Sequence, residues 1–244
     1  MTPPVNGNSA LFLDIDGTLL DIARTPDAVV VPAVLKHSLG KLSQELRGAF
    51  AFVSGRSIST IDKLFAPLST AAIGCHGVEV RGQDGKVRAL APPMPDAVRK
   101  LFRRLAKSHP GVLLEDKVYA LTLHYRLAPE ARFSLMATLQ QEAHLLASKS
   151  ITLIEGKAVI DARPAGIDKG VGLRALIAQK PFRGRRVLFG GDDVTDQDVF
   201  QILPEIGGAG FSVGKSFPGV EHVFASPRAV RQWLTRLADR GMAS

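Results

Sequence analysis

The chain is poor in cysteine and in long apolar runs, and each shortage excludes a class of protein. Cys75 is the single cysteine in 244 residues, so no internal disulfide can form. No stretch has the roughly 18 consecutive apolar residues that a membrane-spanning helix needs. The first seven residues show no secretory signal, and we expect a short disordered leader there. These absences favour a cytoplasmic protein that makes no contact with membranes.

Aromatic residues are also scarce, at 6% of the chain, although the formal net charge of +8 is strongly basic. Surfaces that bind nucleic acids combine clustered basic residues with aromatic stacking platforms, and here the arginines are scattered. The basic balance therefore indicates solubility and some attraction for anionic substrates. We expect a small-molecule substrate, no nucleic-acid partner and a monomer.

The most informative segment covers residues 11–19. An apolar run ends in two carboxylates on alternate residues, Asp14 and Asp16, which Gly17 and Thr18 follow. This pattern predicts a buried strand that opens into a turn at its carboxyl end, where open α/β sheets bind ligands. Two unpaired aspartates repel each other unless a cation lies between them, although Asp and Gly are also common in ordinary turns.

The order of the predicted elements indicates an α/β protein with an inserted unit. Residues 10–80 alternate strand and helix, and a strand–helix pattern resumes after residue 164. We predict a mostly parallel core sheet from residues 1–91 and 164–244, and an inserted α/β domain with an antiparallel sheet from residues 92–163. A linker is expected at 91–95, a hairpin at 83–86, helices at 96–107, 129–147 and from Ser226, and strands at 49–53, 71–74, 76–81, 112–114, 119–125, 151–154, 158–162 and 186–190.

Four groups of polar residues are predicted to lie at strand ends or at a helix start. They are Asp14 with Asp16, then Ser54, then Lys169, and finally Asp192 with Asp193 and Asp196. Each alone has a structural explanation, because serine and aspartate cap helices and most lysines are solvated. Lys169 fits that explanation poorly, since it follows a predicted Asp168 cap and a cation in the first turn opposes the helix dipole. A phosphate between the lysine and the aspartates offsets that cost.

Together these groups suit phosphoryl transfer assisted by Mg²⁺. Asp14 and Asp192 can supply carboxylate ligands and Asp16 its backbone carbonyl, since Mg²⁺ prefers oxygen. One aspartate can attack phosphorus and form an aspartyl-phosphate, while a second carboxyl protonates the leaving alkoxide and later deprotonates water. The Ser54 hydroxyl and the Lys169 ammonium can neutralise the equatorial phosphoryl oxygens.

Four motifs resemble those of the haloacid-dehalogenase-like (HAD) phosphatases, in the order of that family. They are Asp14-x-Asp16-Gly17-Thr18, Ser54-Gly55-Arg56, Lys169-Gly170 and Gly191-Asp192-Asp193-x-x-Asp196. The resemblance implies a Rossmann-like core with an inserted α/β cap, Asp14 as nucleophile and Asp16 as general acid and base. It also implies two sets of ligands: substrate binding by Ser54, Gly55, Arg56 and Lys169, and Mg²⁺ binding by Asp14, Asp16 and Asp192. Asp193 and Asp196 are expected to bind metal waters or to orient their neighbours.

Further stretches carry a closer resemblance: Gly74-Cys75-His76-Gly77-Val78-Glu79, Glu115-Asp116-Lys117 followed by residues 121–126, and Gly156-Lys157 followed by residues 163–170. They are similar to stretches of the trehalose-6-phosphate phosphatases, and the likeness covers roughly residues 10–215. The resemblance implies that the cap reads sugar hydroxyls, with Glu115 as acceptor and Lys117 as donor two residues apart. A solvated pair of opposite charges is the alternative for these two residues. Arg126, Asp161 and Arg163 are additional candidates for substrate binding.

Two positions depart from that family's pattern, because Asp161 and Gln197 stand where it usually has glutamate. The open alternatives are another capped sugar-phosphate phosphatase, a hexose-phosphate mutase, or a non-catalytic sugar-phosphate-binding module that partners a synthase. The two repelling carboxylates of the first motif argue against a degenerate module. The adjacent Cys75 and His76 lack a third orienting group and do not indicate a protease, and Glu79 is expected to fix a turn in the core.

Overall fold

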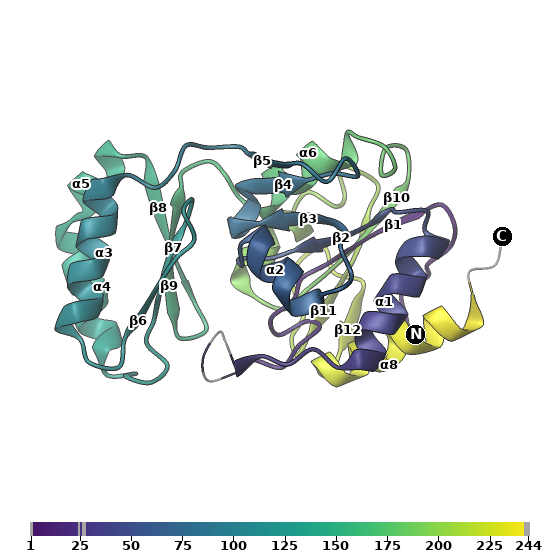
Figure 1. Ribbon diagram of the computed structural model, residues 1–244, viewed down its shortest axis with the longest axis horizontal. Coiled ribbons are helices and arrows are strands. Elements are labelled where there is room, and N and C mark those ends of the chain that lie inside the picture. The colour runs from purple at the N-terminus through teal and green to yellow at the C-terminus, as the bar shows by residue number, and fades with distance from the viewer. Residues whose placement is uncertain (1, 24, 26–27, 242–244) are drawn as a thin grey trace.

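The computed structural model describes residues 2–23, 25 and 28–241, and two β-sheets organise them. Figure 1 shows the larger sheet inside one body and the smaller sheet in a second body beside it. The chain passes between the two bodies twice, near residue 91 and near residue 165. Within the described ranges, every helix is too short or too polar to cross a bilayer.

The larger sheet has eight strands, of which six are joined by parallel pairings. In sheet order they are β12 (His222–Phe224), β11 (Ala209–Val213), β10 (Arg186–Gly191), β1 (Ser9–Leu13), β2 (Phe50–Val53), β3 (Ala71–Gly74), β4 (Glu79–Arg81) and β5 (Val87–Ala89). β1 lies between β10 and β2, and all its residues are buried, which explains why its sequence is apolar without alternation. β4 and β5 form the predicted hairpin and run antiparallel.

The helices that accompany this sheet surround a core rich in phenylalanine. They are α1 (Ala33–Glu45), α2 (Ile58–Phe65), α6 (Lys169–Ile177), α7 (Gln197–Phe200) and α8 (Pro227–Arg240). α1 packs against α8, and α6 packs against β3 and β4. α8 begins and ends as the sequence predicts, since the Ser226 hydroxyl accepts from the backbone N–H of Ala229 and Gly241 follows its last turn.

The smaller sheet is antiparallel, as predicted, and its order is β6 (Leu113–Asp116), β7 (Leu121–His124), β9 (Val159–Pro164) and β8 (Ile151–Gly156). Three helices cover the face that points away from the larger body (Figure 1): α3 (Asp96–Ser108), α4 (Ala131–Gln141) and α5 (Ala143–Ser148). Their apolar residues form a second hydrophobic cluster with Leu121 and Leu123. The helix predicted over 129–147 is two helices, because the chain breaks at Glu142.

Sequence patterns missed some elements of the larger body. β11 and β12 had no strand signal, because β11 contains small residues such as Gly210 and Ser212 that are buried by their neighbours. The strand expected at 76–81 begins instead with a 3₁₀ turn over Cys75–Gly77, and β4 starts at Glu79. The segment expected as a disordered leader contributes Val5 to the core, and Met1 lies outside the described residues.

Candidate active site

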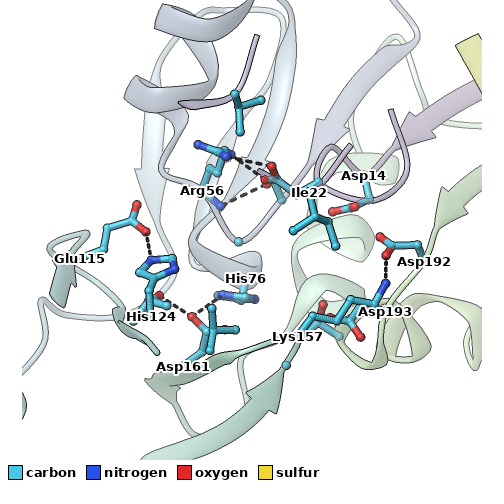
Figure 2. Close-up of a pocket in the computed structure, with 18 of the residues that line it drawn as sticks. Asp14, Ile22, Arg56, His76, Glu115, His124, Lys157, Asp161, Asp192 and Asp193 are labelled. Carbon is cyan, nitrogen blue, oxygen red and sulfur yellow. Dashed lines mark hydrogen bonds and ion pairs between the residues drawn. The ribbon is translucent and has the colours of Figure 1, made fainter. Parts of the chain in front are cut away.

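The site lies at the edge of the larger sheet where β1, β2 and β10 end. These strands are parallel, so the residues that follow them meet there: Asp14 after β1, Ser54 after β2 and Asp192 after β10. Lys169, the first residue of α6, joins them. A cleft of about 860 Å³, its mouth included, opens at this edge and takes its walls from both bodies (Figure 2). The structure therefore brings together all four groups of polar residues that the sequence singles out.

The ammonium group of Lys169 lies between two buried carboxylates. Its Nζ donates to Asp14 Oδ1 at 2.8 Å and to Asp196 Oδ1 at 2.7 Å. Burial disfavours the ammonium, but the charges of Asp14 and Asp196 outweigh burial and raise the pKa of Lys169. Asp168 caps the helix by accepting from the backbone N of Val171 at 2.8 Å, as predicted. The cation in the first turn is thus offset by carboxylates of the protein itself, and not only by a phosphate as the sequence suggested.

Asp14 and Asp192 carry the excess negative charge of the site. Carboxylate oxygens of Asp14, Asp192 and Asp196 all lie within 4.8 Å of one another, and all three side chains are buried. Burial raises the pKa of Asp14 well above its usual range, with Lys169 opposing this rise and the two other aspartates adding to it. Burial and the charge of Asp196 likewise raise the pKa of Asp192. Carboxylate oxygens crowded in this way suit a hard cation such as Mg²⁺.

The residues around Asp192 explain the glycine and threonine of the first motif. Thr18 Oγ1 donates to Asp192 Oδ1 at 3.2 Å, and the ammonium of Lys157, from the turn between β8 and β9, donates to Oδ2. Gly17 has a φ of 91°, and a Cβ atom there would lie 2.1 Å from Asp192 Oδ2. A side chain at residue 17 would therefore push Asp192 out of place.

Asp196 and Asp193 hold the turn that follows β10. Asp196 Oδ2 accepts from the backbone N of Asp192 at 2.8 Å and from that of Asp193 at 3.0 Å, while its Oδ1 accepts from Lys169. Asp193 Oδ1 accepts from the backbone N of Val194 at 2.8 Å, and Asp193 lines the cleft. Because both oxygens of Asp196 are occupied by donors, the geometry favours an orienting role for it.

Asp16 pairs with Arg56 at the cleft. Arg56 Nε donates to Asp16 Oδ2 at 2.6 Å and Arg56 Nη2 donates to Asp16 Oδ1 at 2.8 Å, a bidentate geometry. The Asp16 side chain is 34% exposed, in contrast to the buried Asp14. Both carboxylate oxygens of Asp16 are therefore engaged, and this pair must open before Asp16 can pass a proton to another group.

The turn after β2 presents Ser54 to the cleft. Its Oγ accepts from the backbone N of Arg56 at 3.1 Å, and its backbone N donates to the carbonyl oxygen of Ile73 at 2.9 Å. A hydroxyl that accepts from a backbone N–H retains its own hydrogen for an acceptor such as a phosphoryl oxygen. Gly55 lines the cleft beside it. The residues that the sequence predicts for catalysis and phosphate binding in the larger body therefore lie around one cleft.

The smaller body presents a polar network to the same cleft (Figure 2). His124 Nε2 lies 2.9 Å from Glu115 Oε2, and Lys117 Nζ lies 3.7 Å from the same oxygen. Lys117 donates to Thr122 Oγ1 at 2.7 Å, and this hydroxyl donates to Asp161 Oδ1. The network alternates donors and acceptors, which is the arrangement that hydroxyl groups of a sugar can join.

Both carboxylates of this network are held in the ionised form. Burial alone disfavours the charge of Glu115, but the bond to His124 and the ammonium of Lys117 outweigh it and lower its pKa. Burial of Asp161 is likewise outweighed by His76, Lys117 and its hydrogen bond from a threonine, and its pKa is lowered. These carboxylates therefore differ from Asp14 and Asp192, whose pKa values are raised.

Two further candidates from the sequence have different surroundings. Arg126 lines the cleft, and its guanidinium donates to the carbonyl oxygens of Ala23 and Lys157, the latter at 2.7 Å. Arg163 does not line the cleft, because its Nη1 donates to Asp198 Oδ2 at 3.0 Å on the core. The structure thus brings Arg126 to the site and leaves Arg163 in an ion pair beside it.

Sequence reasoning gave no role to several residues of the cleft, among them the polar residues Thr122, His124, Lys157 and His76. The first two had a signal, since they alternate in β7 with leucines that pack in the cap core. Pairing of Thr122 with Glu115 and with Asp161 in adjacent strands then places all three on the cleft face. Lys157 and His76 belong to stretches that resemble the family, but each reaches the site from a turn, so the sequence did not indicate what they contact. Glu79 does fix a turn, since its Oε2 accepts from the backbone N of Ile58 at 2.7 Å.

Comparisons with known proteins agree with this geometry. Residues 12–226 match the model of the family described as Trehalose-phosphatase. The chain is 42% identical over 223 residues to a probable trehalose-phosphate phosphatase of Sinorhizobium fredii, covering 91% of this chain and 84% of that protein. It is 34% identical over 237 residues to the trehalose-6-phosphate phosphatase of Escherichia coli, covering 96% of this chain and 88% of that protein.

The fold agrees with that of a solved structure over nearly the whole chain. The C-terminal domain of the C. albicans trehalose-6-phosphate phosphatase matches with a TM-score of 0.82 and 25% identity, covering 98% of this chain and 93% of that one. The α/β fold expected from the motifs, a HAD core with an inserted cap, is confirmed. From the matching residues and the shared fold, the chain belongs to the trehalose-phosphatase family.

Proposed function

We propose that this chain is a phosphoric monoester hydrolase that converts trehalose 6-phosphate and water to trehalose and inorganic phosphate. The observation that carries the proposal is the shared cleft, where the buried Asp14 and Lys169 face the polar network of the cap. A phosphoryl group needs a nucleophile and cations, and a disaccharide needs alternating donors and acceptors. The names of the relatives support the choice of trehalose 6-phosphate among sugar phosphates.

Asp14 is the nucleophile in this proposal. Lys169 holds one of its oxygens, which leaves the other to attack phosphorus. A bond forms between this oxygen and phosphorus while the bond from phosphorus to the sugar oxygen breaks. After it releases Arg56, the protonated Asp16 gives its proton to the departing sugar oxygen, and trehalose leaves an aspartyl-phosphate behind.

Water then hydrolyses the aspartyl-phosphate on Asp14. The Asp16 carboxylate takes a proton from the attacking water, a new bond forms between the water oxygen and phosphorus, and the bond from Asp14 to phosphorus breaks. Inorganic phosphate departs, and Asp16 holds a proton again. Throughout, the Ser54 hydroxyl and the Lys169 ammonium stabilise the charge on the equatorial phosphoryl oxygens.

We propose Mg²⁺ as the cofactor, bound by the carboxylates of Asp14 and Asp192 and by the backbone carbonyl of Asp16. The buried acidic cluster supports this choice, because burial and mutual repulsion raise the pKa values of Asp14 and Asp192 even though Lys169 and Lys157 bond to them. When bound, the ion supplies positive charge that favours ionised carboxylates and draws electron density from the phosphoryl group. Asp196 and Asp193 orient the turn that carries Asp192.

The two bodies have different functions in this proposal. The core, residues 1–91 and 164–244, carries the chemistry, and the cap, residues 92–163, selects the substrate. Two separate hydrophobic clusters support this division. The connections near 91–95 and 163–166 serve as hinges, so that closure of the cap excludes water from the cleft. The cap reads the sugar through Glu115, Lys117 and Arg126.

The deciding experiment offers the purified protein a panel of sugar phosphates with Mg²⁺ and measures the phosphate released. We expect the highest kcat/KM for trehalose 6-phosphate. Clear preference for another sugar phosphate would leave a capped phosphatase with a different substrate, and conversion between hexose phosphates without release would indicate a mutase. Binding without any turnover would indicate a non-catalytic module and reject the proposed enzyme.

A further inference from the structure

His76 is fixed to the core at the phosphate-binding turn. Its backbone N donates to the carbonyl oxygen of Ser54 at 3.1 Å, and its φ of 57° lies in the left-handed region. The imidazole packs against Gly55, where an added Cβ atom would lie 2.5 Å from His76 Cε1. The ring position is therefore tied to the turn that presents the Ser54 hydroxyl.

The same ring faces the cap (Figure 2). His76 Nε2 lies 3.3 Å from Asp161 Oδ1, and the two side chains are 7% and 6% exposed. Among the described residues, neither ring nitrogen makes a hydrogen bond of good geometry. A buried imidazole without partners costs free energy, and Asp161 is the acidic group close enough to offset that cost. The mechanism proposed above uses neither nitrogen.

Asp161 connects His76 to the cap residues that are proposed to face the sugar. Its Oδ1 accepts from the Thr122 hydroxyl and lies 3.8 Å from Lys117 Nζ. Lys117 in turn donates to Thr122 at 2.7 Å. One oxygen of Asp161 thus gathers a contact from the core and two from the cap, so Asp161 is better placed to link the two bodies than to bind a sugar hydroxyl with that oxygen.

We propose that His76 is a positioning residue that sets the cap in register with the phosphate site, acting through Asp161 and Lys117. The inference rests on the proposed function, because the register matters only for a substrate that spans both bodies. The contact fixes the separation between Ser54, which binds the phosphoryl group, and Lys117, which binds the sugar. A small aryl phosphate contacts the core alone and does not depend on it.

Two variants remove the contact from opposite sides. His76→Asn introduces a residue that tolerates a left-handed φ but is too short to replace the imidazole. Asp161→Asn keeps the shape of the side chain and removes its charge. The matched control is Asp198→Asn, which removes another ion pair between cap and core, that of Asp198 with Arg163, outside the cleft.

Steady-state kinetics with trehalose 6-phosphate and p-nitrophenyl phosphate separates positioning from folding. We expect each variant to raise KM for trehalose 6-phosphate about tenfold, with kcat for p-nitrophenyl phosphate within about twofold of wild type. The His76→Asn/Asp161→Asn double variant is expected to be no worse than either single one, because both remove one contact. The Asp198→Asn control keeps the wild-type preference. Equal losses on both substrates would mean a purely structural role and overturn the proposal.

Small-angle X-ray scattering provides a measurement that does not depend on the substrate. We expect a larger radius of gyration for His76→Asn and Asp161→Asn than for the wild type and Asp198→Asn, because the cap is less firmly held. If the wild type hydrolyses p-nitrophenyl phosphate but not trehalose 6-phosphate, the assignment of trehalose 6-phosphate as substrate is wrong. The role of His76 in holding the cap is then tested by the scattering measurement alone. Wild-type scattering for both variants then rejects the role of His76.

Discussion

The cleft joins two polar clusters that differ in charge balance. On the core side, Asp14 and Asp196 bond to Lys169 while Asp192 bonds to Lys157, so three buried carboxylates share two ammonium groups, and burial raises the pKa of Asp14 and Asp192. On the cap side, neighbouring donors and cations outweigh burial, and the pKa values of Glu115 and Asp161 are lowered. The difference indicates that the core cluster needs a further cation, whereas the cap cluster is satisfied and can exchange hydrogen bonds with hydroxyl groups.

The two clusters also differ in how the backbone places them. The core groups follow the ends of parallel strands or begin a helix, so the backbone itself brings them to one place. The cap groups belong to one face of an antiparallel sheet, where Thr122 lies between Glu115 and Asp161 in register. A change in the core cluster should therefore stop the chemistry, and a change in the cap cluster should alter only which substrate is preferred.

The largest effect is expected for Asp14→Asn, which removes the nucleophile and keeps the shape of the side chain. We expect kcat to fall at least about 1000-fold for trehalose 6-phosphate and for p-nitrophenyl phosphate alike. The midpoint of thermal unfolding should change little, because the loss of an ion pair with Lys169 is offset by relief of the cost of burying the charge and of repulsion from Asp196 and Asp192. Phosphate release and calorimetry measure both. Normal turnover in this variant, with Asp84→Asn on the exposed hairpin as control, would reject the assignment of Asp14.

A smaller and selective effect is expected for Glu115→Ala. Loss of a charged acceptor raises KM for trehalose 6-phosphate by about 10- to 100-fold, while KM for p-nitrophenyl phosphate stays near the wild-type value. Parallel assays of both substrates measure the ratio, and Glu130→Ala, an exposed carboxylate of the cap, is the control. Equal changes for both substrates would place Glu115 outside sugar recognition and remove the contrast between the two clusters.

The same contrast explains which residues of the site could be predicted from the sequence and which could not. Asp14, Ser54, Lys169 and Asp192 were recognisable because strand ends and helix starts are local features that a short motif records. The partners within the cap were not, because Thr122 meets Asp161 only through the pairing of β7 with β9, 39 residues apart in the chain. A one-residue change of register would turn these side chains to the other face of the sheet.

Removal of the metal offers a third comparison, with a moderate effect on stability. Mg²⁺ should raise the midpoint of thermal unfolding of the wild type by a few degrees, roughly the effect of a ligand at 100 times its Kd, because it relieves repulsion between Asp14 and Asp192. Asp192→Asn should respond much less, and Glu115→Ala should respond like the wild type. Differential scanning calorimetry compares the protein with Mg²⁺, with EDTA, and with a sodium salt at equal ionic strength. The sodium sample separates binding of Mg²⁺ at the site from general screening of charge. An equal shift in wild type and Asp192→Asn would contradict the proposed site.

The smallest effect is expected for the pH dependence of the contact between His76 of the core and Asp161 of the cap, where the two clusters meet. Burial lowers the pKa of His76 below its usual value, although the charge of Asp161 opposes this, while the ammonium groups of Lys117 and Lys169 add to the lowering. The closed arrangement thus favours the neutral imidazole. Its contribution is complete above the pKa of an exposed histidine, about 6.5, and is lost as the pH falls towards the lower pKa of the buried ring. Acid should therefore loosen the cap, not tighten it.

This sign can be tested through the substrate preference as a function of pH. From pH 7 to pH 5, the ratio of kcat/KM for trehalose 6-phosphate to that for p-nitrophenyl phosphate should fall a few-fold in the wild type. His76→Asn has no imidazole to titrate at residue 76, so its ratio should change less over the same range. The change that remains in this variant measures the effect of pH on the two substrates themselves. In Asp161→Asn the imidazole loses its acidic neighbour, so its pKa falls further and the decline should extend to lower pH. A ratio that rises in acid would show that the charged imidazole binds Asp161 strongly enough to overcome burial, and would reverse the predicted direction.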